Sequence, residues 1–159
     1  MKQKKLSSWL KLVIAGMAAC GLLVCFVMLP EIGRTIVSGA PEFAGWYRPW
    51  LAFLWLTAIP CFAALVFGWK IAGNIGADQS FSRENARLLK WIAWMAAGDA
   101  AFFFVGNLIM LLLNMNHPGV ALASLLVVFA GAAVAVAAGC LSHLVGKAAA
   151  LQEQSDLTI

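Results

Sequence analysis

Four long apolar blocks, separated by short polar loops, constrain this chain more than any other feature. They cover about residues 10–29, 50–69, 91–113 and 120–145. A bilayer core of roughly 30 Å is crossed by about 20 helical residues, and each block reaches that length. Backbone groups in lipid must bond within their own segment, and nothing here alternates in polarity as barrel strands would. The blocks predict an all-α fold: a four-helix transmembrane bundle, in a single domain over residues 1–159.

The composition excludes an ordinary soluble domain. Hydrophobic residues make up 63% of the 159 residues and charged residues 11%, against about 45–50% and about 25% in soluble domains. A soluble fold of this size could not bury so much apolar surface. The net charge of +4 is explained by basic residues that flank the apolar blocks, so it is not a sign of nucleic-acid binding.

The basic residues also predict the orientation. The N-terminus, the 70–90 loop and the C-terminal tail together hold nine lysines and arginines, against two in the loops at 30–49 and 114–119. Loops rich in lysine and arginine stay in the cytoplasm, so both termini are expected there. The first block resembles a signal peptide in its basic start. Its apolar run is too long for one, so we interpret it as an uncleaved spanning helix.

Proline and glycine predict where the helices bend or stop. Pro60 lies at the centre of the second block and removes a backbone donor, so a kink is expected there, with Thr57 near a freed carbonyl. The prolines and glycines of the external 30–49 loop are expected to break up any short helix. Gly73 and Gly76 are expected to end the second helix.

The 70–90 loop is the most informative polar stretch. Ser82 is a good N-cap for a helix that runs on into the third block, and Glu84 suits its first turn. Arg83, Arg87 and Lys90 form a basic face near the membrane. This face indicates either anchoring on anionic lipid or docking of a cytoplasmic partner.

One carboxylate, Asp99, lies inside the third block, about 12 Å from its cytoplasmic boundary. A charged aspartate near the bilayer centre costs about 2.5–3.5 kcal/mol, so Asp99 is expected to be uncharged or hydrogen-bonded and to face the bundle interior. The other intramembrane polar candidates are Asn107 and His143. A structural hydrogen bond between helices is one interpretation of Asp99. A polar path for protons or cations is a second, and contact with a ligand or partner is a third.

Small residues recur every fourth position in the fourth block, at Gly131, Ala135 and Gly139, and His143 continues this stripe. Such stripes let helix backbones approach closely. The stripe therefore predicts a packing face, against another helix of the chain or against a second copy in a homo-oligomer.

The sequence shows no catalytic or cofactor site. The four cysteines lie inside the blocks, where we interpret them as small buried hydrophobes and not as disulfide partners. Cys140 and His143 share a helix face, but a metal needs about four ligands, and haem ligation by His143 alone is equally weakly indicated. No Ser/His/Asp set, Walker loop, GxGxxG, HExxH or CxxC motif occurs. We expect a protein that is not an enzyme and holds no metal or cofactor.

Several stretches together resemble a known family. They are PEFAGWYRPWL at 41–51, AIPCFAAL at 58–65, FSRENARLLKWIAW at 81–94 and the closing SDLTI. Their order and spacing are similar to those of small bacterial four-helix inner-membrane proteins grouped as domain of unknown function twenty-nine seventy-five. The more specific features are Ile59–Pro60, the Phe-Ser-x-Glu-Asn stretch from Phe81, and the final Asp-Leu-Thr-Ile. Asp99 is not part of the family pattern.

The resemblance implies a location and a partner. It implies a multi-pass protein of the bacterial inner membrane, in a family without an established activity. Members of that family are often encoded beside a very short helix-turn-helix regulator. We therefore expect a regulatory or sensory protein that contacts such a regulator through Phe81, Ser82, Arg83, Glu84, Asn85, Arg87, Asp156, Leu157, Thr158 and Ile159. A small transporter or channel component that uses Asp99 is the alternative. The DLTI end is either a frayed terminus or a strand added to a partner.

Overall fold

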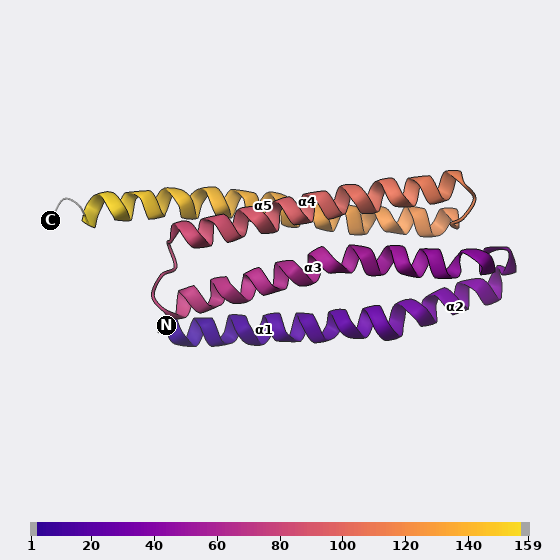
Figure 1. Cartoon of the computed structure of the whole chain (residues 1–159), viewed down its shortest axis with the longest axis horizontal. Helices are drawn as coiled ribbons and strands as arrows, with labels where there is room; N and C mark the ends of the chain where they lie inside the picture. The colour runs from indigo at the N-terminus through magenta and orange to yellow at the C-terminus, as the bar shows by residue number, and fades with distance from the viewer. Residues whose placement is uncertain (1–2, 157–159) are drawn as a thin grey trace.

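The structure is a computed structural model that describes residues 3–156, nearly all of them in helices (Figure 1). In chain order the elements are α1 (Gln3–Leu23), the π-helix η1 (Val24–Met28), α2 (Leu29–Gly39), the 3-10 helix η2 (Pro41–Trp46), α3 (Tyr47–Gly76), α4 (Arg83–Leu112) and α5 (Pro118–Asp156). Four helical stretches, Gln3–Gly39, Pro41–Gly76, Arg83–Leu112 and Pro118–Ser155, are long and apolar enough to cross a membrane. The all-α, four-span fold is therefore confirmed.

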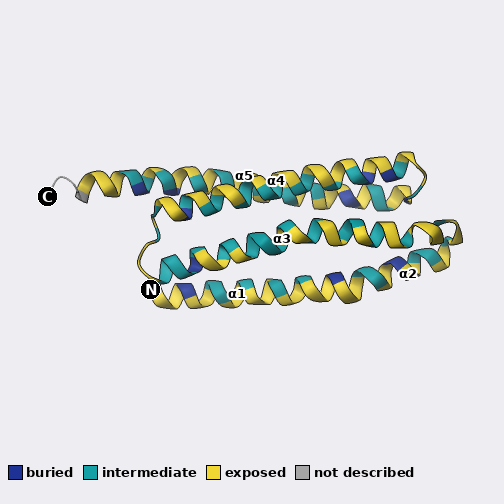
Figure 2. Cartoon of the chain, in the orientation of Figure 1, coloured by how far each residue is buried: buried dark blue, intermediate teal, exposed yellow. Residues whose placement is uncertain are grey.

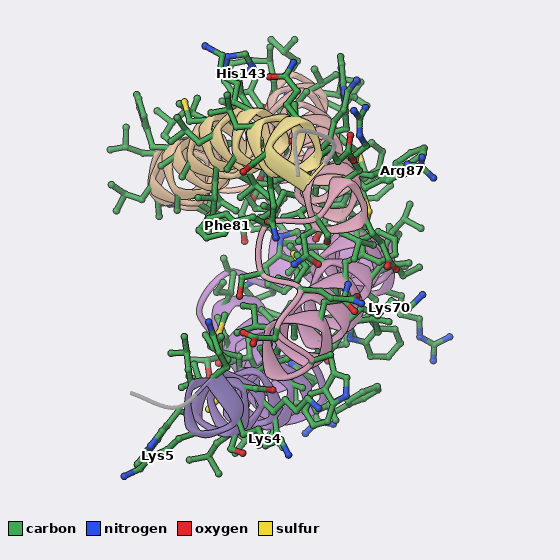
Figure 3. All side chains as sticks on the ribbon, turned by 90° about the vertical axis from the view of Figure 1, so that its left-hand side faces the viewer. Lys4, Lys5, Lys70, Phe81, Arg87 and His143 are labelled. Atoms are coloured by element: carbon green, nitrogen blue, oxygen red, sulfur yellow. The ribbon has the colours of Figure 1, made fainter. Side chains whose placement is uncertain are left out.

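The helices run antiparallel and contact one another in chain order. α1 packs on α3, α3 on α4, and α4 on α5. Within residues 3–156, the backbone of α1 does not approach α4 or α5 closely, and that of α3 does not approach α5. The bundle is thus an open row, which the end-on view shows (Figure 3). One end of the row holds the start of α1, the turn between α3 and α4, and the end of α5 (Figure 1). We call it the basic end.

The first span is longer than the sequence predicted, because the helix continues through Pro30. The N–H of Leu29 bonds to the carbonyl of Val24, five residues back, in the wider π-helical turn. The carbonyl of Cys25 thereby loses its α-helical donor, and Pro30 has no N–H to replace it. The indole Nε1 of Trp55 in α3 donates to this carbonyl at 3.0 Å. Residues 30–49 are helical on both sides of Ala40, so Pro30 and Gly33 do not break the helix as expected. The one break in this stretch lies at Ala40, between Gly39 and Pro41.

The α3–α4 turn and the α4–α5 turn each contain a residue with a left-handed backbone just after the helix ends. α3 runs on through Gly73 and ends at Gly76, so the helix ends at the second of the two glycines expected to end it. The chain turns at Asp78, whose φ of 65° is left-handed, and the N–H of Gln79 reaches back to the carbonyl of Asn74 at 2.9 Å. The turn after α4 uses the same left-handed device at Asn114 (φ 55°).

The second predicted span bends as expected. α3 contains Pro60 inside its helix and changes direction near its middle (Figure 1). Thr57, three residues earlier, donates its hydroxyl to the carbonyl of Leu54 at 2.8 Å. The hydroxyl is therefore satisfied within its own turn of helix.

Many large apolar side chains point outward, and most of the buried residues are small or polar. In the most apolar window of each spanning stretch, at most 11% of the residues are buried, and the outer faces of the row are exposed (Figure 2). Asn85 is the largest side chain that is fully buried in the described part of the chain. An exposed apolar surface of this extent is that of a protein solvated by lipid.

Candidate functional site

The turn between α3 and α4 carries the first group of predicted site residues. Ser82 lies in extended conformation (φ −116°, ψ 153°), and its hydroxyl accepts the N–H of Asn85 at 3.2 Å. It is therefore the N-cap of α4. Glu84 lies exposed in the first turn of the helix, where the helix dipole favours its negative charge.

The buried side chain of Asn85 holds this turn in place through hydrogen bonds. Its side chain is 1% exposed, and its Nδ2 donates to the carbonyls of Gln79 at 3.0 Å and Ser80 at 3.1 Å. Its Oδ1 accepts from Nδ2 of Asn74, near the end of α3, at 2.8 Å. The amide thus ties together the end of α3, the turn and the start of α4. With this burial, Asn85 supports a surface and does not contribute to one.

The exposed residues of the turn do not form one face. Phe81 is 59% exposed although it is a large aromatic residue outside the apolar blocks. Arg87 is exposed one turn into α4, and Figure 3 shows it pointing to the opposite side of the molecule from Phe81. A partner at the basic end would meet these residues on separate sides.

An ion pair joins the start of α4 to the end of α5. Nε of Arg83 donates to Oε1 of Glu153 at 2.8 Å, and Nη2 donates to Oε2 at 2.6 Å. Both side chains are more than half exposed, so the pair fixes geometry more than it adds stability. It places Glu153, three residues before Asp156, next to the start of α4.

The last residues of the predicted contact set are described only in part. Asp156 is the last residue of α5, and Leu157, Thr158 and Ile159 lie outside the described residues. α5 passes the start of α4 before it ends: a Cβ built at Gly146 would lie 3.7 Å from Ala86, so Arg83 is level with about Ala149.

Asp99 contacts α3 through Cys61. It lies near the middle of α4 and is half-buried, and the thiol of Cys61 donates to its Oδ2 at 3.6 Å. Cys61 follows Pro60, at the bend of α3. Asp99 does not line the groove between α4 and α5 or the cavity around Tyr47 and His117.

The other intramembrane polar residues lie far from Asp99 along the helices. Asn107 is buried near the end of α4, where its Nδ2 donates to the carbonyl of Phe103 at 2.9 Å. Its Oδ1 accepts from Nδ2 of Asn116 in the α4–α5 turn at 3.1 Å. His143 is exposed on α5 near the basic end (Figure 3). The structure does not bring Asp99, Asn107 and His143 together.

The small-residue stripe faces α4. A Cβ built at Gly131 would lie 3.1 Å from the Cβ of Ala100, and one at Gly139 would lie 3.8 Å from that of Ala93. Ala135 lies between them at intermediate exposure. The stripe thus lets α5 lie close to α4 in the same chain.

The cysteines differ from the sequence interpretation. All four are free thiols, but only Cys25 is buried, whereas Cys20, Cys61 and Cys140 are exposed on the helix surfaces. Within residues 3–156, no three His, Cys, Asp or Glu side chains lie close enough together to hold a metal.

Three side-chain hydrogen bonds were not predicted from the sequence: Cys61 with Asp99, Asn74 with Asn85, and Trp55 with Cys25. Cys61 was treated only as a small hydrophobe, although it lies at mid-depth in the second block, level with Asp99 in an antiparallel pair. The repeated asparagines on either side of the 70–90 turn were the signal for the second contact. No local signal pointed to Trp55, because its acceptor is backbone.

Comparison with known proteins agrees with this description. Residues 31–159 match the model of the family described as "Protein of unknown function (DUF2975)". The chain is also similar to the uncharacterized membrane protein YoaS of Bacillus subtilis (strain 168), at 29% identity over 142 residues, covering 87% of this chain and 88% of that protein. No solved structure matches the chain. This four-span membrane protein therefore belongs to the DUF2975 family of proteins of unknown function.

Proposed function

We propose that this protein is a non-enzymatic regulatory or sensory protein of the bacterial inner membrane. Its basic end would contact a small cytoplasmic DNA-binding regulator, and the chain itself would bind no nucleic acid. The observation that carries the proposal is a large exposed aromatic residue, Phe81, on a turn that Asn85 holds rigid.

The physical argument rests on the cost of binding. Interfaces draw most of their energy from a few aromatic and arginine side chains. A surface that is already ordered loses less conformational freedom on binding. The turn at Phe81 is ordered by the buried amide of Asn85, and the Arg83–Glu153 pair orders the neighbouring end of α5. The excess of lysine and arginine at this end favours a cytoplasmic location.

The first test is whether a short helix-turn-helix reading frame adjoins the gene. The second is capture of its product by the purified chain in lipid nanodiscs. Phe81→Ala is expected to weaken capture by about 30-fold, the effect of losing one aromatic hot spot. Phe129→Ala is the matched control, because Phe129 is an exposed phenylalanine, at 73%, inside the apolar part of α5. Equal capture by wild type and Phe81→Ala, with both proteins folded, would refute the proposal.

The alternative is a small transporter or channel component that uses Asp99. The contact between Asp99 and Cys61 across α3 and α4 is its one structural support. It requires that Asp99→Asn abolish a pH-dependent flux in proteoliposomes while the protein stays folded. A flux and a thermal midpoint that are both unchanged would remove this alternative.

A further inference from the structure

A groove of about 800 Å³ lies between α4 and α5 at the basic end. Its volume is within the range of about 300–1,000 Å³ that is typical of small-molecule sites. It runs from about Ala135 to Ala150 along α5, or about 22 Å at 1.5 Å per residue. That length exceeds half of a bilayer core of roughly 30 Å.

Three basic or hydrogen-bonding side chains gather at one end of the groove: Lys90 of α4 with His143 and Lys147 of α5. Gly139 faces Ala93 and Gly146 faces Ala86, so Lys90 is level with Ser142 and His143, one turn from Lys147. No Asp or Glu lines the groove, and neither lysine forms an ion pair within residues 3–156. Two positive charges therefore line the same groove, with no Asp or Glu among its lining residues.

The other end of the groove is apolar and shallow-walled. It is lined by the small residues Ala97, Ala135 and Gly139 and by the exposed Trp94 and Val136. These residues belong to the apolar blocks at 91–113 and 120–145, whereas Lys90 and Lys147 lie just beyond them. The groove thus passes from the headgroup level into the level of the acyl chains.

We propose that this groove binds an anionic phospholipid, with the phosphate held by Lys90, His143 and Lys147 and one acyl chain lying along Ala97 and Gly139. Basic pockets between helices at the cytoplasmic boundary suit anionic headgroups. The charges favour a lipid over a helix from a second copy, which would bring apolar side chains to the two lysines. The inference does not depend on the proposed regulatory partner.

Native mass spectrometry of the detergent-purified protein tests the headgroup end. Phosphatidylglycerol and phosphatidylethanolamine with identical acyl chains are titrated separately. Lys90→Gln with Lys147→Gln is expected to weaken phosphatidylglycerol binding by about 30-fold, the factor for two lysines near a phosphate. Lys70→Gln with Arg87→Gln removes the same charge from the same end but lies outside the groove, and should leave binding within about twofold. Equal losses in both double variants would overturn a specific site.

A second variant tests the acyl end without changing charge. Ala97→Trp fills the groove from an exposed position, and Ala101→Trp is its control one turn deeper on α4, also exposed but outside the groove. Only Ala97→Trp should reduce phosphatidylglycerol binding. Unreduced binding by a folded Ala97→Trp protein would overturn the proposal. Competition by inorganic phosphate at the same concentration as the lipid would also overturn the proposal, because free phosphate would then be the ligand. A cross-linked dimer of the Ala135→Cys protein that carries no lipid would overturn it as well, because a second copy would then cover the groove.

Discussion

The indole Nε1 of Trp55 donates to the backbone carbonyl of Cys25 at 3.0 Å, across the contact between α3 and the π-helical turn. This bond accounts for a proline inside a membrane helix. The π turn and Pro30 together leave the Cys25 carbonyl without a helical donor, and a carbonyl in lipid has no water to bond. A side chain from the neighbouring helix supplies the missing N–H.

Trp55→Phe should therefore destabilise the protein by about 1–3 kcal/mol, the cost of an unsatisfied buried carbonyl. The measurement is thermal unfolding in detergent, followed by circular dichroism. Trp91→Phe is the control, because within residues 3–156 the Trp91 indole makes no hydrogen bond. In a Pro30→Ala background, residue 30 regains an N–H, so the effect of Trp55→Phe should shrink. An equal effect in both backgrounds would contradict the assignment.

Asn85→Ala should loosen the α3–α4 turn. It removes hydrogen bonds to the carbonyls of Gln79 and Ser80 and to the amide of Asn74. At about 0.5–1.5 kcal/mol for each bond, the expected loss of stability is about 2–4 kcal/mol. Limited proteolysis should then cut the protein within residues 77–82. Gln79→Ala, which keeps the carbonyl and the exposed position, should not increase cleavage; if it does, side-chain burial at Asn85 is not what holds the turn.

Gly106→Ala should disturb the contact between α3 and α4. A Cβ at this position would overlap the ring of Phe53. That ring cannot move freely, since it stacks on Phe103 at 5.7 Å between centroids and touches Phe102 at 5.4 Å. Overpacking of this kind costs about 1–3 kcal/mol.

The control for Gly106 lies on the same helix. A Cβ at Gly98 meets nothing within 4 Å, so Gly98→Ala should be neutral or stabilising by up to about 1 kcal/mol. Thermal midpoints of the two variants make the comparison, and similar shifts would show that helix propensity, not the Phe53 contact, decides the outcome.

The Arg83–Glu153 pair should affect local order more than global stability, because both side chains are more than half exposed. Arg83→Gln is expected to leave the thermal midpoint unchanged while amide exchange rises in residues 150–155. Arg87→Gln, an exposed neighbour outside the pair, should change neither. Arg83→Glu combined with Glu153→Arg should restore slow exchange, and failure of this swap would mean that the pair does not hold the end of α5.

The sequence by itself determined the number of spans and their helical form. In lipid, an apolar segment of about 20 residues satisfies its backbone N–H and C=O groups by forming a helix. The length and composition of the blocks were therefore sufficient to predict four helical spans. It also placed the N-cap at Ser82 and the bend at Pro60, because both depend on the chemistry of a single residue and its neighbours in the chain.

Only the tertiary structure decided which polar groups meet. Asp99 contacts Cys61, Asn85 contacts Asn74, and Trp55 contacts the carbonyl of Cys25. The two residues of each contact are 11 to 38 positions apart in the chain. The antiparallel register of neighbouring helices sets these pairs, and apolar spans do not encode that register in their periodicity. The open row and the α4–α5 groove likewise depend on which helix faces touch. The sequence does not decide this, because an apolar helix face can contact either lipid or another helix.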